Sequence, residues 1–239
     1  MSRRLRIASF NLENLDDSAD AAVPLETRMA VLRPQLLRLE ADVLCLQEIN
    51  GQRLRKGEPR RLIALDRLLE DTPYRDYARA STSGPGGGVA DVHNVVILSR
   101  FPIVGSSELR HQLVEPPTHR MITAPEPSGD TERIRWDRPV MLTELDAGGA
   151  RLHVLNIHLR APLAAIIPGQ KQGAFSWRSV GGWAEGFFIA AVKRAGQALE
   201  VRLMVDRLFD ADPGALVAVC GDFNAGLDEV PTRIIRGAE

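Results

Sequence analysis

The sequence predicts a mixed α and β domain, on the strength of three observations. Its 239 residues are 44% hydrophobic and 26% charged, which is typical of a folded globular protein. Short apolar runs bounded by turn residues indicate buried strands. Stretches with apolar residues at three- and four-residue spacing indicate helices between those strands. These patterns predict mixed α and β structure without specifying how the layers are arranged. At ~100–200 residues per domain, this length allows one large domain or two small ones.

The expected elements of the N-terminal half begin with a strand at 5–11. Residues 26–40 have helical apolar spacing, and Pro34 is expected to kink that helix. The run 42–47 is almost wholly apolar, which suits a strand buried on both faces. A further helix and strand follow, at 61–69 and 92–98.

The C-terminal half begins after a stretch at 110–137 that is rich in Pro, Thr and charge, so we expect an irregular connection there. Gly148 and Gly149 separate two apolar runs and predict a hairpin of strands. The remaining expected elements are the hairpin strands at 139–145 and 151–157, a long helix at 187–208, a strand at 216–220, and a helix or turn from Pro231.

Net charge, cysteine content and the lengths of the apolar runs bear on the partners and the location of the protein. The net charge of −1 gives no overall electrostatic case for binding nucleic acid or membranes. Cys45 and Cys220 each lie in an apolar run, which predicts buried, reduced thiols. No run reaches the ~18 apolar residues of a membrane span, and the N-terminus lacks the apolar core of a signal peptide. We therefore expect a cytoplasmic protein.

Polar side chains that can bind metal or phosphate stand at the ends of four expected strands. Because such ends commonly gather at one edge of a sheet, these side chains are candidates for a shared site. Carboxylate and amide oxygens are ligands that Mg²⁺ prefers, whereas zinc favours several Cys or His ligands. Each residue alone could instead serve a turn, a helix cap or the core. The candidates are Asn11, Glu48, His158, Asp222 and Asn224.

Six segments along nearly the whole chain resemble, in order, the motifs of the endonuclease/exonuclease/phosphatase superfamily of deoxyribonuclease I-like phosphoesterases. The most specific are Gln47-Glu48 after one apolar strand and Gly221 to Asn224 (GDFN) after another. The resemblance implies that residues 1–239 form a single domain with an α+β fold. That fold is a four-layer α/β-β/α sandwich of two facing mixed sheets with outer helices. The segments are SFNLENL, ADVLCLQEIN, HNVVILSRFPI, RPVMLTEL, LHVLNIHL and AVCGDFNA.

The resemblance also implies the metal site. Glu48 corresponds to the principal metal ligand of the superfamily, and Asn11 to the first-strand asparagine that supports the metal or its water. The implied cofactor is Mg²⁺, with Mn²⁺ as a substitute.

Four further residues receive roles by the same resemblance. Asp222 corresponds to the aspartate that aligns or deprotonates the attacking water. Asn224 corresponds to the asparagine that holds a phosphate oxygen or orients that aspartate. His158 corresponds to the histidine that donates to a phosphate oxygen. Arg138, which precedes a Pro, corresponds to a phosphate-binding arginine found in some members.

The chain departs from the superfamily pattern after Asn224, where no terminal Ser-Asp-His segment follows. We therefore expect the last strands of one sheet to be missing. The chain is either a fragment of a longer protein, which we favour, or a degenerate member. This departure leaves open whether the chain as given is active.

The function implied is Mg²⁺-dependent phosphoester hydrolysis by in-line attack of water. A phosphodiesterase or nuclease is favoured, with nucleic acid as the expected substrate. The basic loop 51–61 could meet a phosphate backbone, although a solvated loop is the simpler interpretation.

One alternative function is that of a phosphatase or of a phospholipid or inositol phosphate hydrolase. In that case the apolar stretch 162–188 would form a lid or a lipid contact, although local core is the favoured interpretation of that stretch. The other alternative is a non-catalytic phosphate-binding module.

Overall fold

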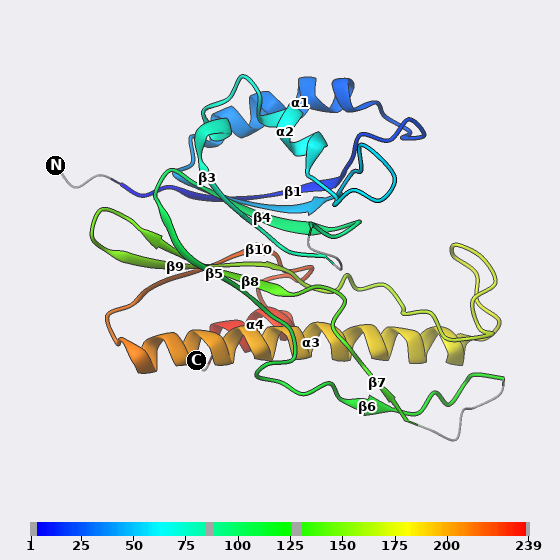
Figure 1. Cartoon of the computed structure of the whole chain (residues 1–239). Coiled ribbons are helices and arrows are strands. Elements are labelled where there is room, and N and C mark those ends of the chain that lie inside the picture. Colours follow the sequence, from blue (N-terminus) through cyan, green and yellow to red (C-terminus); the bar gives the residue numbers. More distant parts are fainter. Residues whose placement is uncertain (1–3, 85–87, 126–130, 238–239) are drawn as a thin grey trace. The chain divides into compact units, whose positions relative to one another are not determined.

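The computed structural model describes residues 4–84, 88–125 and 131–237. Figure 1 labels its helices and strands. The chain divides into two compact units, each assembled from segments that are distant in the sequence. The first unit comprises Met1–Glu108, Val140–His158 and Asp212–Asp222, and the second comprises Leu109–Pro139, Leu159–Ala211 and Phe223–Glu239.

The first unit contains a four-stranded mixed sheet in the order β1-β2-β4-β3. Strands β1 and β2 are parallel, whereas β4 runs antiparallel to both β2 and β3. Because β2 is central and almost wholly buried, its continuous apolar sequence is the expected one. The strands are β1 (Ile7–Leu15), β2 (Val43–Ile49), β3 (Ala78–Ser81) and β4 (Asn94–Ser99).

Two helices, α1 (Leu25–Leu39) and α2 (Ile63–Leu69), cover the outer face of this sheet (Figure 1). A 3₁₀ turn at Pro73–Asp76 follows α2. Alternate residues of β2 face the helices: Leu44 and Leu46 pack in one buried cluster with Leu36 and Leu65. Burying a leucine contributes roughly 1.5–3 kcal/mol, so this cluster anchors both helices to the sheet.

A second four-stranded mixed sheet in the same unit has the order β10-β9-β8-β5. Strands β9 and β10 are parallel, and β8 and β9 form the predicted antiparallel hairpin. The remaining face of β2, with Val43 and Cys45, packs in one cluster with Met141 and Val154 of this sheet. The expected fold of two facing mixed sheets with helices is confirmed. The strands are β5 (Ile103–Leu109), β8 (Val140–Asp146), β9 (Arg151–His158) and β10 (Leu216–Asp222).

The second unit contains the long helix α3 (Val180–Ala211) packed with α4 (Val230–Arg236), and the short hairpin β6 (Thr118–His119) and β7 (Glu132–Arg133). Buried Glu200 of α3 fixes part of the connection that lacks regular structure. It accepts hydrogen bonds from the backbone N–H groups of residues 111–113 and from the indole Nε1 of Trp136. Among the described residues, no helix is both long and apolar enough to cross a membrane.

Several boundaries differ from those predicted. Strand β1 continues past Asn11 to Leu15 through an irregular register, because Glu13 and Asn14 adopt positive φ angles of 46° and 53°. Helix α3 begins at Val180 rather than 187, because Gly182 and Gly186 lower helix propensity yet are buried in its first turns. Strands β3, β5, β6 and β7 were not predicted, since they are short or lack a regular alternation of apolar residues.

The thiols are free, with Cys45 buried and Cys220 half-buried. Their reduced state is the predicted one, whereas full burial of Cys220 was expected and is wrong, because β10 is half-exposed along most of its length.

Glu185 of α3 gives the second unit a pH-dependent contribution to stability. Burial alone would raise the pKa of Glu185, but hydrogen bonds from Thr123, the Ile122 N–H and His119 outweigh it and lower the pKa from 4.5 to about 2. A carboxyl group whose pKa is lower in the folded than in the unfolded state stabilises the folded state at pH values above its unfolded-state pKa. This stabilisation is lost as the pH falls through the folded-state pKa. Near pH 6, we expect the free energy of unfolding of the unmodified chain to exceed that of the Glu185→Gln variant by about 3 kcal/mol. Denaturant titrations should show this gap narrowing between pH 5 and pH 2.

Candidate active site

The carboxyl ends of two parallel strand pairs meet in the first unit and bring four predicted residues together. Strands β1 and β2 of the first sheet contact β9 and β10 of the second. Asn11 lies in β1, Glu48 in β2, His158 at the end of β9 and Asp222 at the end of β10. His158 and Asp222 are register partners, so they leave their sheet side by side.

Asn11 links the two carboxylates of this cluster. Its Nδ2 donates to Asp222 Oδ2 at 2.8 Å and to Glu48 Oε1 at 3.1 Å. His158 Nε2 lies 3.4 Å from Glu48 Oε1 and 3.8 Å from Asp222 Oδ2. The His158 side chain is 2% exposed, whereas Glu48 and Asp222 are 17% and 28% exposed. The cluster therefore combines a buried imidazole with two carboxylates that are partly exposed to solvent.

The position of Glu48 depends on an irregularity in the ladder between β2 and β4. The register shifts between Leu46 and Ile49, and Glu48 has a φ of 59°. A positive φ is uncommon for a residue other than glycine and must be held by its surroundings. Asn156 of the opposite sheet fixes the backbone beside this irregularity, because its Nδ2 donates to the carbonyl oxygens of Leu46 and Val96 at 3.1 and 2.9 Å.

Two backbone N–H groups donate to the remaining side-chain oxygens of Glu48 and Asn11. The N–H of Asn14 donates to Glu48 Oε2 at 3.1 Å, and the N–H of Glu13 donates to Asn11 Oδ1 at 2.8 Å. The Asn11 amide is thereby oriented with its nitrogen towards both carboxylates. The left-handed conformation of Glu13 and Asn14 thus shapes this side of the cluster.

Gly221 permits the close approach of β10 to β9. Its φ is 133°, and a Cβ atom there would lie 2.0 Å from the carbonyl oxygen of Ile157. Any other residue would push the strands apart one position before the His158–Asp222 pair. This explains physically why glycine precedes the aspartate.

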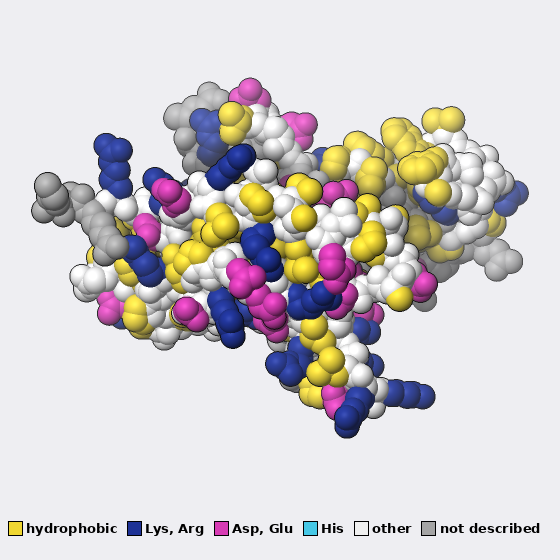
Figure 2. All heavy atoms as spheres, turned by 90° about the horizontal axis from the view of Figure 1, so that it is seen from above, with side chains coloured by type: hydrophobic (Ala, Val, Ile, Leu, Met, Phe, Trp, Pro, Cys, Tyr) yellow, Lys and Arg dark blue, Asp and Glu magenta, His cyan; other side chains and the backbone are white. Residues whose placement is uncertain are grey.

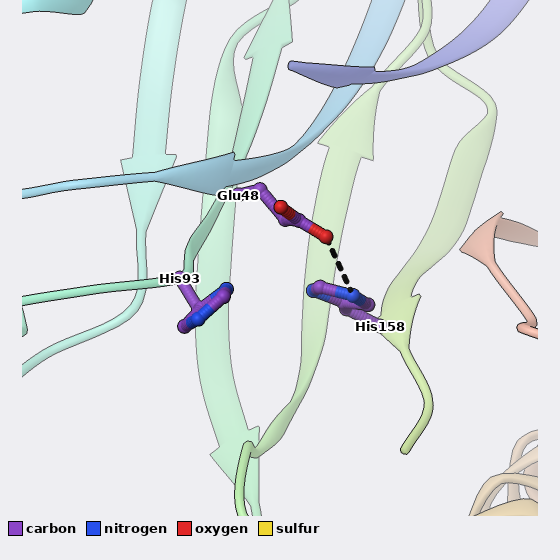
Figure 3. Close-up of side chains that lie close together, drawn as sticks. All are labelled: Glu48, His93 and His158. Atoms are coloured by element: carbon purple, nitrogen blue, oxygen red, sulfur yellow. Dashed lines mark ion pairs between the residues drawn. The ribbon is translucent and has the colours of Figure 1, made fainter. Parts of the chain in front are cut away.

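His93 was not predicted, yet its side chain joins the cluster. Ligand atoms of Glu48, His93 and His158 all lie within 4.8 Å of one another (Figure 3). His93 precedes β4, whose start pairs with the end of β2 because the two strands are antiparallel. His93 was missed because only residues at the carboxyl ends of strands were considered. A predicted antiparallel pairing of β4 with β2 would have placed His93 near Glu48.

The donor set fits a divalent cation. Glu48 and Asp222 supply carboxylate oxygens that face the same space, and imidazole nitrogens lie beside Glu48. Such a mixture suits hard ions through oxygen and transition ions through nitrogen.

Asn224 and Arg138 belong to the second unit. Asn224 Nδ2 donates to the Leu159 carbonyl at 2.9 Å, and the Asn224 carbonyl accepts a hydrogen bond from Arg194. The carbonyl of Arg138 accepts one from Gln197. These contacts are structural, and the predicted roles of both side chains at the phosphate stay predictions.

Three solved structures illustrate the similarity of this fold to others. Truncated TDP2 of Caenorhabditis elegans matches with a TM-score of 0.51 and 18% identity, over 92% of this chain and 62% of its own. A mannosyl-6-phosphatase of Bacteroides thetaiotaomicron matches with a TM-score of 0.57 and 17% identity, over 97% and 70%. Sphingomyelinase C of Streptomyces griseocarneus matches with a TM-score of 0.58 and 16% identity, over 97% and 68%.

The chain thus spans about 62% of the TDP2 chain. No curated protein is similar enough in sequence to count as a match. The family assignment comes from the sequence itself, because the model of the Endonuclease/Exonuclease/phosphatase family matches residues 8–238, nearly the whole length. On this match, and with the expected two-sheet fold in place, the chain belongs to the Endonuclease/Exonuclease/phosphatase family.

Proposed function

We propose that this chain hydrolyses phosphate esters with the help of a divalent cation, and that phosphodiesters of nucleic acid are its favoured substrates. The observation that carries the proposal is the convergence of four predicted residues, from four strands of two sheets, into one cluster. Family membership supports the same reaction class.

The cation, Mg²⁺ with Mn²⁺ as a substitute, would be held by Glu48 and would neutralise charge on the phosphate. Asp222 would orient a water molecule and accept its proton. His158 would donate a hydrogen bond to a phosphate oxygen, where charge develops during the reaction. Asn11 fixes the separation of the two carboxylates, and we keep the prediction that it also supports the metal or its water.

Basic residues in the loop after β2 favour a polyanionic substrate. Arg53, Arg55, Lys56 and Arg61 are exposed, whereas Arg60 pairs with Asp91. On the face shown in Figure 2, basic and acidic side chains are interspersed, in keeping with the small net charge. A basic loop that follows the strand carrying Glu48 would therefore contribute to binding without making the whole surface positive.

The test is hydrolysis of bis(p-nitrophenyl) phosphate beside p-nitrophenyl phosphate, with and without Mg²⁺ and EDTA. We expect Mg²⁺-dependent turnover of the diester that EDTA abolishes, followed by cleavage of DNA or RNA. A preference for the monoester would instead favour the phosphatase alternative. Saturable phosphate binding without turnover of either ester would favour the non-catalytic alternative.

Exposed aromatic side chains support the lipid-directed alternative. Phe175 is 97% exposed, and Trp183 and Phe188 are 45% and 51% exposed, so the expectation that this stretch is local core is wrong for them. Trp177 does pack against a buried cluster, as expected. One structural neighbour is a sphingomyelinase and another a sugar phosphatase, which makes lipid and sugar phosphates the comparison substrates. A cytoplasmic location stays a prediction from the sequence.

A further inference from the structure

We propose that Glu48, His93 and His158 form a binding site for a borderline transition-metal ion such as Zn²⁺ or Co²⁺, and that His93 is the ligand that favours these ions over Mg²⁺. The proposal deepens the proposed function, because Glu48 and His158 belong to the same cluster. It adds a nitrogen ligand, His93, that the phosphoesterase chemistry does not require.

The spacing of the three side chains suits one ion. Glu48 Oε1 and His158 Nε2 are 3.4 Å apart, which is about the separation of two ligands that each lie ~2.0–2.1 Å from a shared ion. Ligand atoms of all three residues lie within 4.8 Å of one another, so small side-chain rotations close the set around an ion. Figure 3 shows the two imidazoles and the carboxylate gathered in one place.

The segment that carries His93 is held firmly by its neighbours. His93 has a φ of 59°, and its N–H donates to Asn50 Oδ1 at 3.2 Å. The next residue, Asn94, donates to the carbonyl oxygens of Ile49 and Ala90. The site thus sits on strand ends whose backbones are fixed before any ion binds, which lowers the cost of assembling the ligands.

The chemistry of the ligands determines which ion binds. Mg²⁺ prefers oxygen ligands and dehydrates reluctantly, whereas neutral imidazole binds Co²⁺ and Zn²⁺ strongly. With two imidazoles and one carboxylate, we expect Zn²⁺ to bind at least about 100-fold more tightly than Mg²⁺. An ion held in this way also occupies His158, so Zn²⁺ should inhibit hydrolysis that Mg²⁺ supports.

The experiment titrates the full chain with Zn²⁺, Co²⁺ or Mg²⁺ alone, by calorimetry and by the visible absorption of Co²⁺. The variant is His93→Asn, because asparagine tolerates a left-handed φ and the backbone should survive. The control is His153→Asn, which removes an imidazole from the opposite face of β9, five positions before His158. Circular dichroism checks that both variants fold.

We expect His93→Asn to weaken Zn²⁺ and Co²⁺ binding about tenfold or more, to change the Co²⁺ spectrum, and to leave Mg²⁺ affinity almost unaltered. His153→Asn should match the unmodified chain. Equal Zn²⁺ affinity in His93→Asn and the unmodified chain would overturn the proposal. Because binding is measured without turnover, a chain that hydrolyses no ester would refute the proposed function while leaving this result intact.

Discussion

Replacing Glu48 with Gln is expected to lower kcat/KM for Mg²⁺-supported phosphodiester hydrolysis by about a thousandfold, or roughly 4 kcal/mol of transition-state stabilisation. Glutamine keeps the shape of the side chain but removes its charge. Its amide nitrogen would also face donors, because Asn11 Nδ2 and the Asn14 N–H both donate to the Glu48 carboxylate. The measurement is steady-state kinetics over a range of Mg²⁺ concentrations.

A matched control separates this effect from loss of structure. Glu144→Gln changes a carboxylate of the same unit that forms an exposed ion pair with Arg151. Exposed pairs contribute ~0–1 kcal/mol, so Glu144→Gln should keep both its stability and its rate. If Glu48→Gln stays folded and keeps more than about a tenth of the rate, Glu48 does not hold the cation.

Much of the cluster could be predicted because strand ends follow a simple rule. The apolar run before Glu48 and the run before Asp222 each predict a strand, and parallel strands of a sheet end at the same edge. Structure adds the distances, and it shows why the residues meet, since both sheets contribute a parallel pair to the same edge. Of the four residues that the structure brings together, Glu48 and Asp222 come from the two most specific motifs, whereas Asn11 and His158 come from the less specific ones.

The features that were missed depend on contacts that a local pattern does not contain. His93 lies at the start of a strand, and it reaches Glu48 only because β4 is antiparallel to β2. The left-handed conformation of Glu13 and Asn14 follows from hydrogen bonds to Asn11 and Glu48. The exposed Phe175 was misjudged because large aromatic residues are usually buried.

Asn156→Leu is the substitution expected to destabilise the first unit most directly. Asn156 is fully buried, and its Oδ1 accepts a hydrogen bond from Gln47 Nε2 at 2.8 Å. Its Nδ2 donates to two carbonyl oxygens at the point where the β2–β4 register shifts. Leucine has a similar size, but it cannot form hydrogen bonds with the Gln47 amide or with the two carbonyl oxygens. We expect this loss to lower the free energy of unfolding by about 2–4 kcal/mol.

Thr143→Val is the matched control, because Thr143 is also buried between the sheets. Within the described part of the chain, its hydroxyl has no hydrogen-bond partner, so an apolar side chain of the same shape should leave stability unchanged or raised. Chemical denaturation of both variants measures the difference. Asn156→Leu should also lose hydrolytic activity under conditions where it is still folded, because the irregular register that directs Glu48 into the site depends on Asn156. If Asn156→Leu were as stable and as active as Thr143→Val, the position of Glu48 would have to be set by β2 and β4 alone.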